Sequence, residues 1–182
     1  QHLLADTNAS AVVVDDVREL HGLSEDAVAA AAEAGRARDL DGSYVLSLVL
    51  PTDQPALASL TGRALRERLF RASVNRGRNG NDHATSDVVL RMAALRAERA
   101  RLLGYTDHAA YVVEDETART SDAVTSMLTR LVPAAVANAR AEAADLQAVT
   151  GDSATLQAWD WAYYSERIRR ERYEIDAKLP RS

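Results

Sequence analysis

The pattern that most limits the fold of this chain is a long run of helical periodicity with little strand signal beside it. From residue 53 to about residue 178, apolar side chains recur at intervals of three and four residues, which is typical of amphipathic helices. Much of the 47% hydrophobic content is alanine, which favours helix and contributes little burial per residue. The sequence therefore predicts a mainly α fold, a multi-helix lobe with a helical bundle over residues 53–178.

The strand signals lie near the N-terminus. Residues 11–17 (AVVVDDV) and 44–50 (YVLSLVL) are short, β-branched and apolar runs of strand length. Between them, Ser24 precedes two acids and is expected to cap a helix, with Leu23 and Val28 as a hydrophobic staple. A minor two-strand β element, strand–helix–strand over residues 11–50, is thus predicted, and residues 1–182 are expected to form a single lobe.

Cap signals divide the helical part. Thr52 or Asp53 is expected to begin one helix that runs to about Val74, and residues 75–82 (NRGRNGND) read as a loop. The next helix is expected to start at Thr85 or Ser86 and to be closed by Gly104, and a short one is expected to start at Thr106. A long helix is expected to start at Ser121, to be kinked at Pro133 and to end at Gly151. Helical spacing predicts these core positions: Leu57, Leu60, Ala64, Leu65, Leu69, Ala72, Val88, Met92, Leu95, Leu102, Val124, Leu128, Leu131 and Ala135.

Aromatic residues are sparse in this chain but cluster in residues 158–167 (AWDWAYYSER). Asp160 stands where a helix N-cap is expected, so Trp159 would pack on Tyr164 as a staple, and Trp161 would share a face with Tyr164 and Ile168. We interpret the aromatic cluster as packing the start of this helix against the core. The alternative is that these aromatic side chains contact a ligand directly.

Composition excludes several classes of protein. The net charge of −5 argues against general affinity for nucleic acid or an anionic membrane, and no apolar run is long enough to span a bilayer. The chain has no cysteine, so disulfides and thiolate chemistry are absent. A cytoplasmic protein without nucleic-acid or membrane partners is expected.

The sequence offers little chemistry of its own. None of its histidines (His2, His21, His83, His108) begins a His-Glu-x-x-His motif, and there is no nucleophile elbow or phosphate-binding glycine loop. Catalytic, cofactor-binding and metal-ligating residues are therefore all assigned as none in this chain.

Two further patterns have alternative interpretations. Residues 77–80 (GRNG) match the GxxG loop of KH domains, although a flexible glycine loop explains them more simply. Arginines on residues 91–101 and 167–172 suggest basic faces, but acids stand at pairing distance in Glu98–Arg101, Glu166–Arg170 and Arg167–Glu171. Solvated, ion-paired faces are the expected result.

Three blocks, in this order and at these intervals, resemble one family: residues 63–77 (RALRERLFRASVNRG), 95–120 (LRAERARLLGYTDHAAYVVEDETART) and 158–176 (AWDWAYYSERIRRERYEID). They are similar to the thimet oligopeptidase family of zinc metallopeptidases, in its peptidyl-dipeptidase (dipeptidyl carboxypeptidase) branch. The branch usually has proline where this chain has Ala158, and asparagine where it has His83.

The resemblance implies a neurolysin-like zincin: a two-lobed, mainly helical peptidase with a deep channel that admits short peptides. Zinc would be held on a His-Glu-x-x-His helix that maps to no position of this chain. The chain begins at Gln1 rather than methionine and ends directly after a charged helical pattern, so it is expected to be an inactive fragment that precedes the catalytic lobe.

Three hypotheses about function follow. The first is a fragment of a zinc peptidase that releases C-terminal dipeptides, with zinc in the parent enzyme, none in this chain, and short peptides and the missing catalytic lobe as partners. The alternatives are a freestanding helical interaction module and a weak GxxG-type nucleic-acid binder that uses residues 77–80 and the arginine faces. Salt-dependent RNA binding that is lost on changing Arg78 and Gly80 would support the last of these. Apolar surface left uncovered is expected mainly on the last helix, around residues 161–175 and especially at Tyr173 and Ile175.

Overall fold

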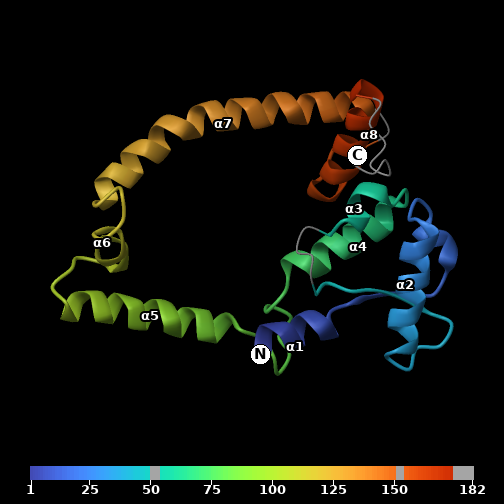
Figure 1. Ribbon diagram of the computed structural model, residues 1–182, viewed down its shortest axis with the longest axis horizontal. Coiled ribbons are helices and arrows are strands. Elements are labelled where there is room, and N and C mark those ends of the chain that lie inside the picture. The colour runs from blue at the N-terminus through green and yellow to red at the C-terminus, as the bar shows by residue number, and fades with distance from the viewer. Residues whose placement is uncertain (50–53, 151–153, 174–182) are drawn as a thin grey trace, which may run out of the picture. The chain divides into compact units, whose positions relative to one another are not determined.

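The computed structural model describes residues 1–49, 54–150 and 154–173. This part of the chain is mainly helical with a two-stranded antiparallel sheet near the N-terminus, which confirms the predicted fold class (Figure 1). Two compact units are present, residues 1–84 with 145–182, and residues 85–144. The elements are α1 (His2–Ala9), β1 (Val12–Val14), η1 (Val17–Leu20), α2 (Glu25–Arg36), β2 (Tyr44–Leu46), α3 (Ala56–Ser59), α4 (Arg63–Val74), α5 (Ser86–Leu102), α6 (His108–Val113), α7 (Ser121–Thr150), η3 (Ala158–Asp160) and α8 (Trp161–Tyr173).

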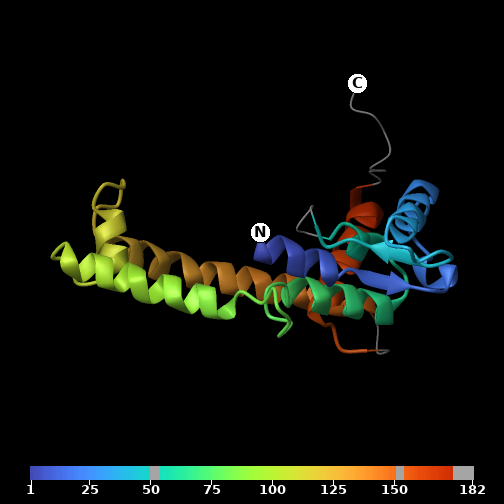
Figure 2. The same ribbon diagram turned by 90° about the horizontal axis from the view of Figure 1, so that it is seen from below.

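The strand–helix–strand element forms as predicted, with shorter strands. β1 pairs antiparallel with β2, with Val13 opposite Val45, and α2 packs against β2 (Figure 2). The Ser24 hydroxyl accepts the Ala27 N–H at 3.3 Å, which confirms the predicted cap of α2. Local cap chemistry was enough to place the start of this helix.

The core of the first unit gathers apolar side chains from the sheet and from α2, α3 and α4. Leu23 and Val28, the predicted staple pair, both pack against it at its edge. Ala64 is exposed, although helical spacing predicted it inside. The buried core residues are Val12, Val14, Leu20, Ala31, Leu48, Leu57, Leu60, Leu65 and Leu69.

The prediction of a single helix from residue 53 to Val74 is wrong, because the helix is interrupted between α3 and α4. The break is set by a close backbone approach: Thr61 N–H donates to His21 O at 3.0 Å. Gly22 adopts φ +101° there, and a Cβ on it would stand 2.1 Å from the Ser59 carbonyl oxygen. This contact comes from a distant part of the sequence, so helical spacing did not reveal it. Thr52 and Asp53, the predicted caps, lie outside the described residues.

α1 was not predicted, and its sequence gives little helical signal. Its buried residues are Asp6 and Thr7, both polar, so it lacks the apolar stripe that periodicity detects. The carboxylate of Asp6 contacts the loop after α4, described below. Tertiary contact thus holds a helix that composition alone would not indicate.

α5 begins at Ser86 with Thr85 as its N-cap residue, as predicted, whereas the caps of α6 and α7 differ by one residue from those predicted. Asp107, not Thr106, caps α6 by accepting the Ala110 N–H at 2.9 Å. Ser121 is the first residue of α7, and the preceding hydroxyl, Thr120 Oγ1, accepts the Ala123 N–H at 3.1 Å. In each case two adjacent polar residues are both suitable caps, so the sequence alone does not select between them.

α5 and α7 expose the apolar positions that were predicted to be core. Met92 on α5 and Leu131 on α7 are 42% and 57% exposed. α7 continues as one helix through Pro133 and is drawn as a gradual bow in Figure 1, and Gly151 lies outside the described residues. Of the core positions predicted on these two helices, Val124 is half-buried. The others are exposed: Val88, Met92, Leu95, Leu102, Leu128, Leu131 and Ala135.

Candidate functional site

Asp160, at the end of η3, accepts hydrogen bonds from three residues of the first unit. Arg66 donates from Nη2 to Asp160 Oδ1 at 2.8 Å, and Arg63 donates from Nη2 to Oδ2 at 2.7 Å. The Gln157 N–H also donates to Oδ2, at 3.1 Å. Side chains of Arg66 and Asp160 are 2% and 1% exposed, so this is a buried ion pair.

The electrostatics of Asp160 follow from these contacts. Burial alone would raise the pKa of its carboxyl, but hydrogen bonds from Arg63, Arg66 and Gln157 outweigh it and hold the pKa below the ordinary value. The same pairing raises the pKa of Arg63. Asp160 is therefore a charged anchor between α4 and the start of α8, and not the simple N-cap of α8 that was predicted.

The aromatic cluster surrounds this anchor. Trp159 packs on Phe70 of α4 with ring centroids 6.3 Å apart, and not on Tyr164 as predicted. The Arg71 guanidinium lies 5.2 Å from the Trp159 ring centroid, and that of Arg66 lies 4.3 Å from the Tyr163 ring centroid. The aromatic rings thus pack on side chains of α4, which supports a structural role for the cluster.

The GxxG loop is bound from inside the molecule. Asp6 on α1 accepts the Gly77 N–H at 2.5 Å and the side-chain amides of Asn79 and Asn81 at 2.9 and 2.7 Å. The Gly77 hydrogen bond is the main cause that lowers the pKa of the Asp6 carboxyl. A carboxylate at the centre of the loop repels a phosphate group, so this geometry favours a closed structural loop over a nucleic-acid grip.

The histidines are dispersed among separate contacts. His21 Nδ1 lies 3.2 Å from Thr61 Oγ1, His2 and His83 have ring centroids 6.0 Å apart, and His108 stacks on Tyr111. Within the described ranges, no group of three metal-ligating side chains comes together. The residues present here therefore do not fit a zinc site.

The arginines of α8 are ion-paired as predicted. Glu166 receives Arg170 at 2.7 Å, and Arg167 reaches Glu171 at 3.5 Å. Arg169 adds a second bond to Glu166, and together these hydrogen bonds lower the pKa of the Glu166 carboxyl to about 2. Glu98 and Arg101 form no such pair on α5 within the described part of the chain.

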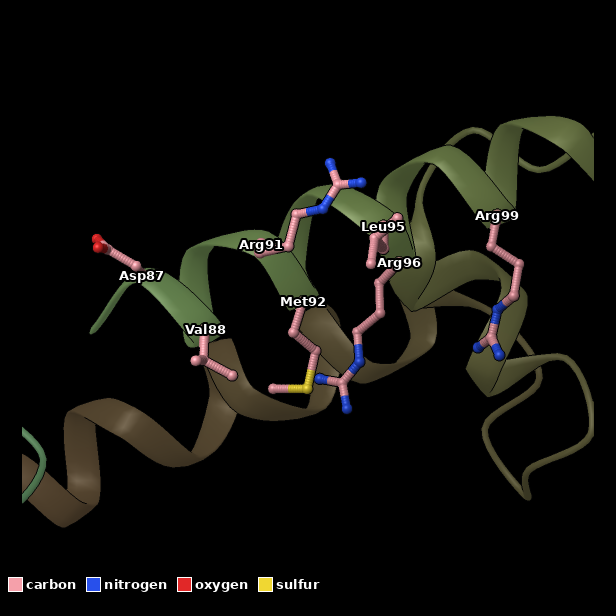
Figure 3. Close-up of a pocket in the computed structure, with 7 residues that line it drawn as sticks. All are labelled: Asp87, Val88, Arg91, Met92, Leu95, Arg96 and Arg99. Atoms are coloured by element: carbon pink, nitrogen blue, oxygen red, sulfur yellow. The ribbon is translucent and has the colours of Figure 1, made fainter. Parts of the chain in front are cut away.

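A groove lies along α5 in the second unit. An apolar row of Val88, Met92 and Leu95 forms its floor, and Arg91 and Arg96 project beside the row (Figure 3). The open space above the row has a volume of about 550 Å³. No nucleophile or general base pair accompanies the groove, so it is suited to contact with an apolar surface and not to chemistry.

Comparison with known proteins assigns the chain to a family. Residues 56–182 match the sequence profile described as peptidase family M3. The chain belongs to peptidase family M3. The family match confirms the predicted resemblance, and the curated proteins that match the chain include dipeptidyl carboxypeptidases and oligopeptidases.

The M3 chain is 38% identical to the dipeptidyl carboxypeptidase of Escherichia coli and 40% identical to that of Salmonella typhimurium. Both alignments extend over 97% of the M3 chain. It is 35% identical to oligopeptidase A of Escherichia coli over 90% of its length. These matches cover 26%, 26% and 25% of the three relatives. The M3 chain thus spans about a quarter of the length of the curated relatives that it matches.

Proposed function

We propose that residues 1–182 form part of the non-catalytic lobe and channel wall of a zinc metallopeptidase that releases C-terminal dipeptides from short peptides. The observation that carries the proposal is the alignment of nearly the whole chain with a quarter of two dipeptidyl carboxypeptidases. Identity to oligopeptidase A is lower and extends over less of the chain, which favours the dipeptidyl branch.

The catalytic groups of the proposed enzyme would lie outside residues 1–182. This sequence has no His-Glu-x-x-His motif, and its histidines contact Thr61, Tyr111 or, in the case of His2 and His83, each other. When bound, zinc in such an enzyme polarises the substrate carbonyl and activates water. The contribution of this chain is mechanical: long helices that limit which peptides reach the catalytic groups.

A test of the activity uses the protein expressed from its complete gene. The substrate pair is a blocked pentapeptide with a free C-terminal carboxylate and the same peptide amidated at the C-terminus. We expect the enzyme to release the C-terminal dipeptide from the peptide with the free carboxylate. The amide should react at least about tenfold more slowly, because it loses one charged hydrogen bond to the carboxylate in the transition state, which costs at least about 1.4 kcal/mol. Mass spectrometry of the products measures both.

The outcomes separate the two peptidase classes. Internal cleavage of both peptides at equal rates would assign an oligopeptidase and reject the dipeptidyl proposal. No cleavage of either peptide would reject a peptidase altogether and favour the interaction-module hypothesis. Chelator treatment should abolish the activity and zinc should restore it, because the metal is the proposed Lewis acid.

Residues 1–182 alone provide the control. This chain, purified after chelation, is expected to retain no stoichiometric zinc and to release no dipeptide above background, since it contains no ligand set or water-activating glutamate on a zinc helix. Metal analysis and the same peptide assay check this. Stoichiometric zinc in the isolated chain would place a ligand set within these 182 residues and contradict the assignment.

A further inference from the structure

The groove on α5 is an apolar row with a basic border, as Figure 3 shows from the side. Val88, Met92 and Leu95 stand at intervals of four and three residues, so they lie on one face of the helix. They are 60%, 42% and 45% exposed. Ala100, on another side of α5, is fully buried, and α6 packs against this helix. The second unit therefore leaves the apolar row without a partner of its own.

The border of the row carries unpaired positive charge. Arg91 and Arg96 flank it on opposite sides, and neither takes part in an ion pair within the described ranges. Arg99, at one end, lies with its guanidinium 4.8 Å from the Tyr111 ring centroid. Asp87, at the other end, is the one acid on the groove lining. A surface that is apolar in the middle and cationic at both edges is complementary to an apolar stripe bordered by acids.

Two apolar surfaces in the described part of the second unit, the face of α7 and the α5 row of a second copy, lack those acids. The exposed apolar positions of α7 extend from Met127 to Val136, and the one charged residue in that stretch of the sequence is Arg130. A second copy that presented its own α5 would bring Arg91 and Arg96 against the same arginines. Like charges placed opposite one another oppose both arrangements.

We propose that the α5 groove binds an amphipathic helix that carries Asp or Glu beside its apolar stripe and belongs to the same polypeptide outside residues 1–182. The proposal rests on the proposed function, in which this chain is part of a longer peptidase. The matched relatives are about four times as long as the aligned segment, so a protein of their length would have ample chain to supply the helix. Docking of a helix into an apolar groove would bury the row that now contacts water and pair the two arginines.

Cysteine labelling tests this, because residues 1–182 contain no cysteine. Leu95→Cys places a thiol in the groove, and Ala97→Cys places one on the far side of α5, about 200° away around the helix. Both variants are made in the 182-residue chain and in the protein expressed from the complete gene. Maleimide labelling at the two positions is followed by peptide mass spectrometry.

The two thiols should label at similar rates in the 182-residue chain. In the complete protein, the Leu95→Cys thiol should label at least about tenfold more slowly than the Ala97→Cys thiol, because a bound helix must open before reagent enters. Adding Arg96→Glu to Leu95→Cys should restore labelling several-fold. Adding Arg78→Glu, which reverses an exposed charge on the 75–82 loop, should leave the protection intact.

Several results would overturn the proposal. Equal labelling of both thiols in the complete protein means that nothing covers the groove, and a gene that encodes no further helix leads to the same conclusion. Protection that vanishes on dilution assigns the groove to a second copy. Protection that survives Arg96→Glu rejects an acidic partner. The peptidase assay is run on the same samples, so an active enzyme with an open groove rejects only the docking proposal, and an inactive protein with a protected groove rejects only the proposed function.

Discussion

At the scale of single residues, the buried carboxylate of Asp160 connects α4 to the start of α8 through its ion pair with Arg66. Asp160→Asn keeps the shape but leaves Arg66 buried beside a neutral group, so we expect a loss of about 3–5 kcal/mol in the free energy of unfolding. Asp145→Asn is the matched control, because the Asp145–Arg172 pair is about 60% exposed on both sides and should contribute less than about 1 kcal/mol. Urea denaturation measures both variants. Equal effects would mean that the burial of Asp160 does not matter.

Glu166 gives a prediction about acid stability. Its folded pKa of about 2 lies below the ordinary 4.5, so its ion pairs stabilise the fold fully above about pH 4.5 and are lost as the pH falls toward about 2. Glu166→Gln should therefore lower the Tm at pH 7, and the difference from the parent chain should shrink steadily from pH 5 to pH 2. Glu98→Gln, made on an exposed residue of α5 that forms no ion pair within the described ranges, should show no such convergence.

At the scale of elements, one glycine decides where two helices separate. Gly22 combines φ +101° with a site where a Cβ would overlap the Ser59 carbonyl, so Gly22→Ala must move the backbone at the α3–α4 break. We expect a loss of at least about 3 kcal/mol, since strain in the left-handed region alone costs about 1–3 kcal/mol. Gly42→Ala is the control: its φ is +88° but nothing lies within 4 Å, so it should show the conformational cost alone. Similar losses would mean that the close approach is relaxed in solution.

At the scale of the whole molecule, the uncovered apolar surface lies chiefly on α5 and α7, and not on the last helix as predicted. Tyr173 is 64% exposed as expected, but Ile175 lies outside the described residues, and the longer runs of exposed apolar residues belong to the two long helices. Because α7 has little charge near its apolar positions, it is the surface through which the isolated chain is expected to associate.

Charge placed on α7 should reduce that association. Met127→Glu with Leu131→Glu adds two acids at positions 45% and 57% exposed, so sedimentation should show a more monomeric chain with unchanged helical content. Ser126→Glu with Ala137→Glu adds the same charge on another side of α7 and should change the association little. If both pairs act equally, net charge and not the apolar face controls the association. Unfolding by the first pair would instead place Met127 and Leu131 in a core.

The sequence by itself determined what depends on neighbouring residues. The helical class, the Ser24 cap of α2, the 75–82 loop, the α8 ion pairs and the family all follow from local patterns or ordered motifs, because caps and turns are formed by groups a few residues apart. Tertiary structure decided the rest. The α3–α4 break needs Gly22, and the role of Asp160 needs Arg66, which lies 94 positions earlier in the chain. Periodicity showed which faces of α5 and α7 are apolar, but whether an apolar face is buried depends on a partner surface, and spacing along one helix carries no information about that partner.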